Sequence, residues 1–341
     1  MSLPEERRQR EPLQRLHLRR PRWERRVPRR RERGRAIAGY LIRRFVQSLF
    51  VLLGLTIVVF FVTRMVGDPV RLMLHPNATE EQIATVREQY GLDDTLLVQF
   101  GRFMGDLAHG DFGDSMWQRA PALEIVSGRL PATLYLAGVT MAIAFPVAVI
   151  LGVISAVWPR SLADRIVTVF SLAGLSIADF WLALVMILVF AVEFGWLPTS
   201  GYGGAEFVIL PALTLAARPL GRISQVQRSA MLDELAKGYV TTARSKGLSE
   251  RVVVLYHTMK NAAIPTVTMA GHEAASLLNG AIVIETIFGW PGIGSMLIQA
   301  IERRDLALVV TATIIIATMV ITVNFLVDVL YALVDPRVRF A

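Results

Sequence analysis

The chain has 341 residues, of which 53% are hydrophobic and only 19% charged. Soluble domains carry roughly a quarter charged residues, so this composition indicates a membrane protein. The chain contains no cysteine, which excludes disulfides, thiolate metal sites and cysteine nucleophiles. The formal net charge is +8, but residues 1–36 alone hold 14 Arg against 5 Glu, a net of +9, so the remainder carries 8 − 9 = −1.

Residues 1–38 form a basic N-terminal extension without apolar periodicity, and we expect this extension to be disordered and cytoplasmic. Its basic region is far longer than that of a signal peptide, and a full membrane span follows it. Such a block orients the N-terminus toward the cytoplasm and can contact anionic lipid headgroups. Nucleic-acid binding and a start codon upstream of the natural one are the alternative interpretations.

Six apolar runs are long enough to cross a bilayer. They cover residues 45–63, 131–157, 166–192, 207–226, 265–288 and 306–327. If both termini are cytoplasmic, the distribution of basic residues satisfies the positive-inside rule at every loop. The sequence therefore predicts an all-α polytopic membrane protein with a first transmembrane helix at 39–66, an external lobe at 67–130, and a core of five more transmembrane helices at 131–341.

The predicted lobe at 67–130 is long and has an excess of acidic residues, both of which favour the outer side of the membrane. A helix is predicted over Thr79–Tyr90, with Thr79 as its N-cap. A second, amphipathic helix is predicted over Leu96–Leu107. This lobe could meet a substrate-delivery protein or serve only as a spacer packed on the spans.

A polar, basic segment interrupts the apolar runs at residues 239–265, within a predicted cytoplasmic loop at 228–265. We expect a short helix over Ala243–Lys246 that ends at Gly247 in a left-handed conformation. Ser249 suits the N-cap of the next helix, and Asn261 and Pro265 suit the opening of another. Two short helices joined by a glycine would form a docking surface for another protein, the alternative being a solvated loop without a partner.

The chain has no phosphate-binding loop of its own. Such a loop requires a lysine followed by Ser or Thr after a glycine-rich turn. The three lysines, Lys237, Lys246 and Lys260, are instead followed by Gly or Asn. If ATP drives this protein, the ATPase must therefore be another chain.

Five charged residues fall within the predicted spans, where charge is costly and commonly functional. Asp179, Arg218 and Glu273 are the candidates to line a transport pathway. Mutual pairing between helices is the alternative for these, and for Arg222 and Glu285, which lie nearer span ends, pairing or snorkelling is the favoured interpretation. No second histidine lies four residues from His272, so we predict neither a metal site nor a catalytic one.

Several stretches of the chain resemble a known family. In the polar segment the likeness rests on Tyr239, Thr242, Ala243, Arg244, Lys246, Gly247, Leu248, Ser249, His257, Asn261, Ala262, Ile264 and Pro265. This stretch is similar to the cytoplasmic coupling loop of ABC importer permeases, in the variant of the dipeptide/oligopeptide/nickel permeases. Thr241-Thr242 stand where the founding EAA pattern has Glu-Ala.

Six other stretches extend the resemblance from about Tyr40 to the C-terminus. They are YLIRRFVQSLFVLLGLTIVVFFVTRMVGDP, FWLALVMILVF, GWLPTSGY, ETIFGWPGIG, AIERRD and NFLVDVLYALVDPRVR. The first is similar to the opening of B-type dipeptide-permease subunits. One departure is Ala178, where the family often has proline before Phe-Trp, and from it we expect a less kinked third span.

The resemblance implies a B-type permease subunit with the type I ABC importer fold, located in the bacterial cytoplasmic membrane with both termini in the cytoplasm. Its implied partners are a second homologous permease, two ABC ATPase domains that hold ATP and Mg, an external substrate-binding protein, and lipid, but no nucleic acid. No cofactor is expected on this chain itself. The residues implied to contact the ATPases are Tyr239, Thr242, Ala243, Arg244, Lys246, Gly247, Leu248, His257 and Asn261.

The implied cargo is a di- or oligopeptide. Nickel complexes, glutathione-like peptides and oligosaccharides are carried by related systems and stay open as alternatives. A proton-coupled secondary transporter that uses the intramembrane acids is a second hypothesis, but it predicts inverted repeats that the sequence does not show clearly. A membrane scaffold would leave the structured polar loop unexplained.

Overall fold

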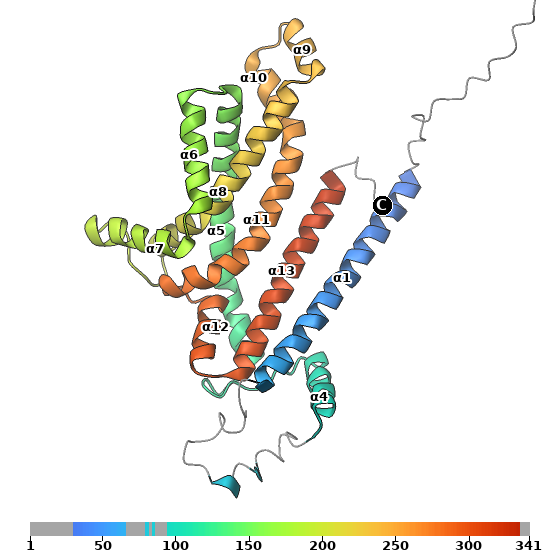
Figure 1. The fold of residues 1–341 in the computed structure, drawn as a ribbon, viewed down its shortest axis with the longest axis vertical. Coiled ribbons are helices and arrows are strands. Elements are labelled where there is room, and N and C mark those ends of the chain that lie inside the picture. Colours follow the sequence, from blue (N-terminus) through green and yellow to red (C-terminus); the bar gives the residue numbers. More distant parts are fainter. Residues whose placement is uncertain (1–29, 66–78, 82–83, 86–93, 335–341) are drawn as a thin grey trace, which may run out of the picture.

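The computed structural model describes residues 30–65, 79–81, 84–85 and 94–334. A bundle of long helices dominates this part of the chain (Figure 1). The bundle helices are α1 (Arg30–Met65), α5 (Ala122–Val157), α6 (Leu162–Ser176), α8 (Ala205–Leu235), α11 (Met259–Ile287) and α13 (Leu306–Val334). Within the described residues, five helices are long and apolar enough to cross a membrane, and there are six spans when the bent helix pair is counted as one broken span. The predicted all-α fold with six spans is therefore confirmed.

Helix α8 packs closely against α5 and α6 because small residues line both contacts. A Cβ atom added at Gly174 would lie 2.5 Å from the carbonyl oxygen of Ala217, and one added at Gly221 would lie 2.5 Å from that of Ser171. Without side chains at these two positions the backbones of α6 and α8 approach each other directly, as is common between membrane helices. The three helices form the centre of the bundle.

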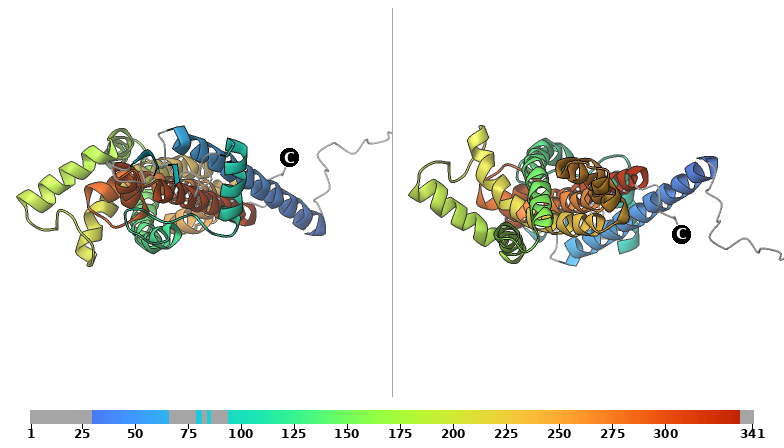
Figure 2. Two further views of the ribbon diagram at one scale, coloured as in Figure 1. Left: turned by 90° about the horizontal axis from the view of Figure 1, so that it is seen from below. Right: turned by 90° about the horizontal axis from the view of Figure 1, so that it is seen from above.

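The third span is broken, which corrects our expectation of a less kinked helix. Helix α6 ends at Ser176, and α7 (Asp179–Met186), continued by the π-helix η1 (Ile187–Glu193), leaves it at an angle of 109°. Ile177 and Ala178 have extended backbones with ψ angles of 133° and 134°. Two extended residues turn the chain without a proline, so the alanine at position 178 does not straighten it. Helix α7 consequently projects away from the bundle (Figures 1 and 2).

Helices α1 and α13 lie side by side at the edge of the bundle (Figures 1 and 2). Arg44 Nε lies 3.1 Å from Asp328 Oδ2, and the Tyr40 hydroxyl donates to Asp328 Oδ1 at 3.3 Å. One carboxylate thus joins the first span to the last. Most of the remaining α1 surface is exposed and apolar, as expected for a helix that faces lipid.

Two short helices lie at the end of the bundle opposite α9 and α10, which are described below (Figure 1). Helix α4 (Leu96–Ala108) covers the predicted amphipathic helix, and its Phe100 and Phe103 contact Phe60 of α1 with ring centroids 5.3 and 5.4 Å apart. The helix predicted over Thr79–Tyr90 and the N-terminal extension lie largely outside the described residues. The described end of the extension, residues 30–38, belongs to helix α1, which corrects the prediction of disorder there.

Helix α12 (Ile293–Glu302) is held at its N-terminus by Glu285. The Glu285 carboxylate accepts hydrogen bonds from the backbone N–H of Gly294 at 2.7 Å and of Ser295 at 3.1 Å, and from Thr133 Oγ1 at 2.7 Å. These bonds satisfy helix-terminal donors and connect α11, α12 and α5. Glu285 therefore connects helices through hydroxyl and backbone donors, rather than through the charged partner or the snorkelling that the sequence favoured.

The fifth span begins earlier than predicted. Helix α10 (Glu250–Val252), the π-helix η2 (Val253–Thr258) and α11 form one apolar segment of 38 residues, Glu250–Ile287, and Pro265 lies inside it. The expectation that Pro265 opens a helix was wrong. The carbonyl that this proline frees belongs to Asn261, an exposed residue, so water can satisfy it. The second span likewise starts at Ala122, before the predicted Pro131.

Candidate functional site

The polar segment between α8 and α11 folds as a cap on one end of the bundle (Figure 1). We call residues 237–260 the coupling segment. Its first helix, α9 (Gly238–Ser245), begins five residues before the predicted start at Ala243. Gly247 has a φ of +78°, its N–H bonds to the Arg244 carbonyl at 2.9 Å, and the Leu248 N–H reaches the Ala243 carbonyl at 3.4 Å. This is a Schellman motif, and the predicted left-handed glycine is confirmed.

The two sides of α9 have different roles. Val240 and Ala243 are buried and pack with Val253 of η2 and Leu235 of α8. Ala243 therefore faces inward and stabilises the cap. The other predicted coupling residues of this stretch point outward: the side chains of Thr242, Arg244, Lys246 and Leu248 are all exposed. Exposed apolar side chains continue this surface at Val252, Leu255 and Tyr256.

An ion pair braces the turn at Gly247. Arg244 of α9 donates through Nε to Glu250 Oε2 at 3.1 Å and through its second terminal nitrogen to Oε1. This two-pronged contact holds α9 and α10 at a fixed distance across the glycine. Ser249 occupies the predicted N-cap position, but its side chain forms no capping hydrogen bond.

Tyr239 connects the coupling segment to two long helices. Its hydroxyl donates to Glu234 Oε2 of α8 at 2.7 Å and accepts from Asn261 Nδ2 of α11 at 3.2 Å. Partial burial raises the pKa of the Tyr239 hydroxyl, and the bond to Glu234 adds to this rise, so the hydroxyl stays protonated and can donate. The structure thus brings Tyr239 and Asn261 together, whereas His257 lies apart on η2 beside Tyr256.

Four of the five charged residues in the predicted spans form two pairs. Arg218 of α8 lies 3.6 Å from Asp179 at the start of α7, and Arg222, one turn further along α8, lies 3.1 Å from Glu273 of α11. Glu273 is 2% exposed and Arg222 is 48% exposed. Of the predicted pathway candidates, Asp179 and Arg218 contact each other. Glu273 instead contacts Arg222, for which pairing or snorkelling was the favoured interpretation.

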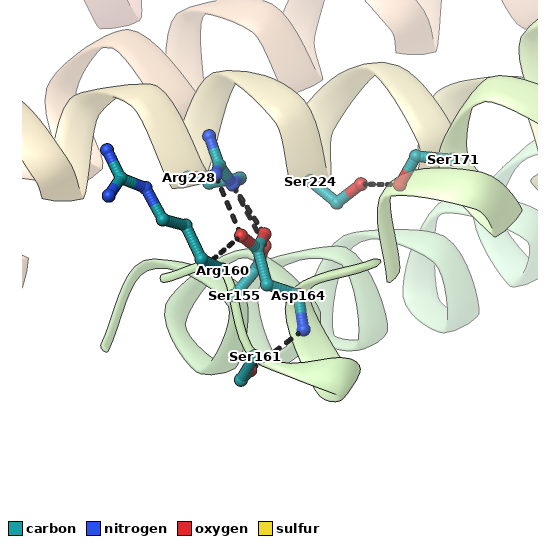
Figure 3. Close-up of polar contacts among 7 residues, drawn as sticks. All are labelled: Ser155, Arg160, Ser161, Asp164, Ser171, Ser224 and Arg228. Atoms are coloured by element: carbon teal, nitrogen blue, oxygen red, sulfur yellow. Dashed lines mark hydrogen bonds and ion pairs between the residues drawn. The ribbon is translucent and has the colours of Figure 1, made fainter. Parts of the chain in front are cut away.

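A third charged site joins α8 to the hairpin of α5 and α6, and the sequence analysis missed it (Figure 3). The buried Asp164 carboxylate accepts from Arg228 Nε at 2.8 Å and from a terminal nitrogen of Arg228 at 3.0 Å. The Ser155 hydroxyl and the backbone N–H of Arg160 also donate to it, the latter at 2.8 Å. Arg228 lies two turns before the end of α8, so this junction fixes the helix that leads into the coupling segment.

One local signal could have identified this junction. Ser161 and Asp164 have the spacing of a helix N-terminus, and the Asp164 N–H donates to Ser161 Oγ at 3.2 Å. That spacing predicts the start of α6 but not the partner on α8, which is 64 residues away. Further along the same interface, Ser171 and Ser224 share a hydrogen bond of 2.7 Å (Figure 3).

Comparison with known proteins agrees with this architecture. Residues 148–340 match the family described as "Binding-protein-dependent transport system inner membrane component", and residues 37–137 match its N-terminal companion. The chain belongs to this family. It is a multi-pass inner-membrane protein and a permease subunit of an ABC importer of the peptide/nickel type, so the resemblance seen in the sequence is confirmed.

Two relatives illustrate the match of this permease. The oligopeptide transport system permease protein AppB of Bacillus subtilis is 36% identical over 316 residues, which cover 89% of this chain and 100% of the relative. The glutathione transport system permease protein GsiC of Escherichia coli K12 is 38% identical over 303 residues, 89% of this chain and 99% of the relative. A solved amino acid ABC transporter aligns with a TM-score of 0.49 and 15% identity over 61% of this chain and 93% of its own.

Proposed function

We propose that this permease is the B-type subunit of an ATP-driven importer of di- and oligopeptides. The observation that supports this most directly is the coupling segment, a rigid cap with an exposed polar and apolar outer surface at one end of the bundle. Two ABC ATPase domains carrying ATP and Mg would receive this cap and its counterpart on a second, homologous permease. An external substrate-binding protein would dock at the opposite end, beside α4 and α12.

The structure suggests how motion at the cap would reach the membrane. Tyr239 bonds to both Glu234 and Asn261, so a displacement of α9 would act on α8 and α11 together. These two long helices carry Arg218, Arg222 and Glu273 at mid-length. Coupling through packed, rigid elements of this kind would let ATPase closure change the access of the pathway from the inner to the outer side.

The peptide cargo is supported by the relatives, whose names state oligopeptide and glutathione transport. Glutathione is itself a small peptide with free carboxylates. The pathway would run past Asp179 and Arg218, because partly exposed charges within spans are stable only where they meet water or protein, and past Glu273, which is buried but pairs with the exposed Arg222. The coupling segment and both termini would lie in the cytoplasm.

Reconstituted transport tests this function. The permease, its second permease, its ATPases and its binding protein are placed in proteoliposomes, and uptake of radiolabelled trialanine is measured. We expect uptake that requires ATP inside the vesicle lumen corresponding to the cytoplasm and is unaffected by a protonophore. Uptake that persists without ATP and is abolished by the protonophore would instead support proton coupling.

A further inference from the structure

The two arginines of α8 lie near the middle of this helix. Arg218 is as far from the first residue of α8, Ala205, as Arg222 is from the last, Leu235. At 1.5 Å per residue each arginine is about 20 Å from its nearer helix end. Residues four apart on a helix share a face. A charged arginine exposed to hydrocarbon is costly, so the common face of Arg218 and Arg222 is expected to meet water or protein.

Both guanidinium groups keep most of their hydrogen-bonding capacity. Arg218 is 46% exposed and its nearest contact with Asp179, at 3.6 Å, is too long for a hydrogen bond. Within the described part of the chain it donates to no acceptor. Arg222 donates one bond, from Nη1 to Glu273 Oε1 at 3.1 Å. A guanidinium has five N–H donors in a rigid fork, so several remain free to bind a ligand.

A third arginine on the same helix shows what a purely structural pair looks like. Arg228 is 29% exposed and donates to Asp164 through two nitrogens, with a further bond to Ser155 at 3.0 Å. Its carboxylate partner is buried and receives four donors in total. Arg218 has none of this support, and its carboxylate partner Asp179 is itself partly exposed.

We propose that Arg218 and Arg222, on one face of α8, form a binding site for a carboxylate of the cargo. The proposal rests on the proposed import function and adds the chemical class that the pathway recognises. Two arginines with Asp179 and Glu273 make a neutral cluster, which suits a zwitterion better than a bare anion. The C-terminal carboxylate of a short peptide would lie against Arg218, and the buried Glu273 would hold Arg222 in position.

The test compares two probes that differ only at the C-terminus, trialanine and trialanine amide. Equilibrium binding of each radiolabelled probe is measured on the permease–ATPase complex in nanodiscs without binding protein, in parallel with ATP-driven uptake by the full importer. The variants are Arg218→Gln, Arg218→Lys and, as a matched control, Arg165→Gln, which removes an exposed arginine at the start of α6.

The wild type and Arg165→Gln are expected to bind the free acid more tightly than the amide. Arg218→Gln is expected to reduce that preference by about tenfold or more, since hydrogen bonds between charged groups are lost. Arg218→Lys keeps the charge but not the fork and should give an intermediate ratio. If Arg218→Gln does not assemble, the same comparison is made with Arg218→Lys, and a preference for the free acid below that of the wild type supports the site.

The outcomes separate this site from the proposed function. If an assembled Arg218 variant prefers the free acid over the amide as strongly as the wild type does, the proposed binding site is wrong, even where ATP-driven peptide uptake proceeds. Wild-type protein that binds neither probe also overturns it. If the wild type imports no peptide yet discriminates acid from amide through Arg218, the import function is wrong and the carboxylate site stands.

Discussion

At the scale of single residues, the charged groups of this permease fall into three classes that differ in burial and in hydrogen bonding. Asp164 and Glu285 are buried, accept several hydrogen bonds and connect helices. Arg218 and Arg222 are half-exposed and keep free donors. Arg244 is on the cap and pairs across a turn. The sequence shows that each of these residues is charged and lies in or beside a span. It does not show which helix supplies the hydrogen-bonding partner, and that partner decides the class.

The junction at Asp164 provides a test at this scale. Asp164→Asn removes the charge that Arg228 pairs with and leaves a poorly compensated guanidinium between α5, α6 and α8. We expect the free energy of unfolding to fall by about 3 kcal/mol. This is the low end for breaking a buried ion pair, because Arg228 retains some contact with water. The measurement is the apparent unfolding temperature of the purified protein. Asp106→Asn, at an exposed position of α4, is the control, and equal temperatures for the two variants would contradict a structural role for Asp164.

At the scale of elements, the apolar runs predicted the number of spans and their order, and the spacing around Gly247 predicted how α9 ends. The breaks and close contacts were not predictable in the same way. The bend at Ile177 and Ala178 is produced by two backbone angles with no proline to signal it. Conversely, Pro265 predicts the start of a helix, but the helix of the fifth span begins before Pro265 and continues through it.

The close approach of α6 and α8 can be tested with one methyl group. Gly221→Ala would place a Cβ 2.5 Å from the Ser171 carbonyl oxygen, so the two helices must separate. Overpacking of this kind lowers the free energy of unfolding by roughly 1–3 kcal/mol. In the matched variant Gly138→Ala the added Cβ meets nothing within 4 Å, and no loss is expected. Thermal unfolding of both variants measures the difference, and an unchanged unfolding temperature for Gly221→Ala would show that the contact is looser than described.

At the scale of the whole molecule, the account places the coupling segment on the cytoplasmic side and α4 with α12 on the outer side. The chain has no native cysteine, so a single introduced cysteine is a unique reporter. In cells whose outer barrier is permeable, an impermeant maleimide should label Gln118→Cys directly and Lys246→Cys only after lysis. Both positions are exposed, so accessibility within the protein does not limit labelling. Labelling of Lys246→Cys before lysis would reverse the proposed orientation.

The central claim is that the outer surface of the coupling segment binds an ATPase. Gly247 offers a direct test because a Cβ added there meets nothing within 4 Å, so a side chain at this position points to solvent or to the partner. Its φ of +78° strains most residues, but asparagine tolerates it, which makes Gly247→Asn the matched control for Gly247→Arg.

The decisive measurement is the amount of ATPase recovered per permease when each form is purified from membranes in which the importer's other subunits are co-expressed. We expect wild type and Gly247→Asn to recover the ATPase and Gly247→Arg, inserted at the same level, to lose most of it. Equal recovery by Gly247→Arg, or no recovery by the wild type, would contradict the claim that this cap receives the motor of the importer.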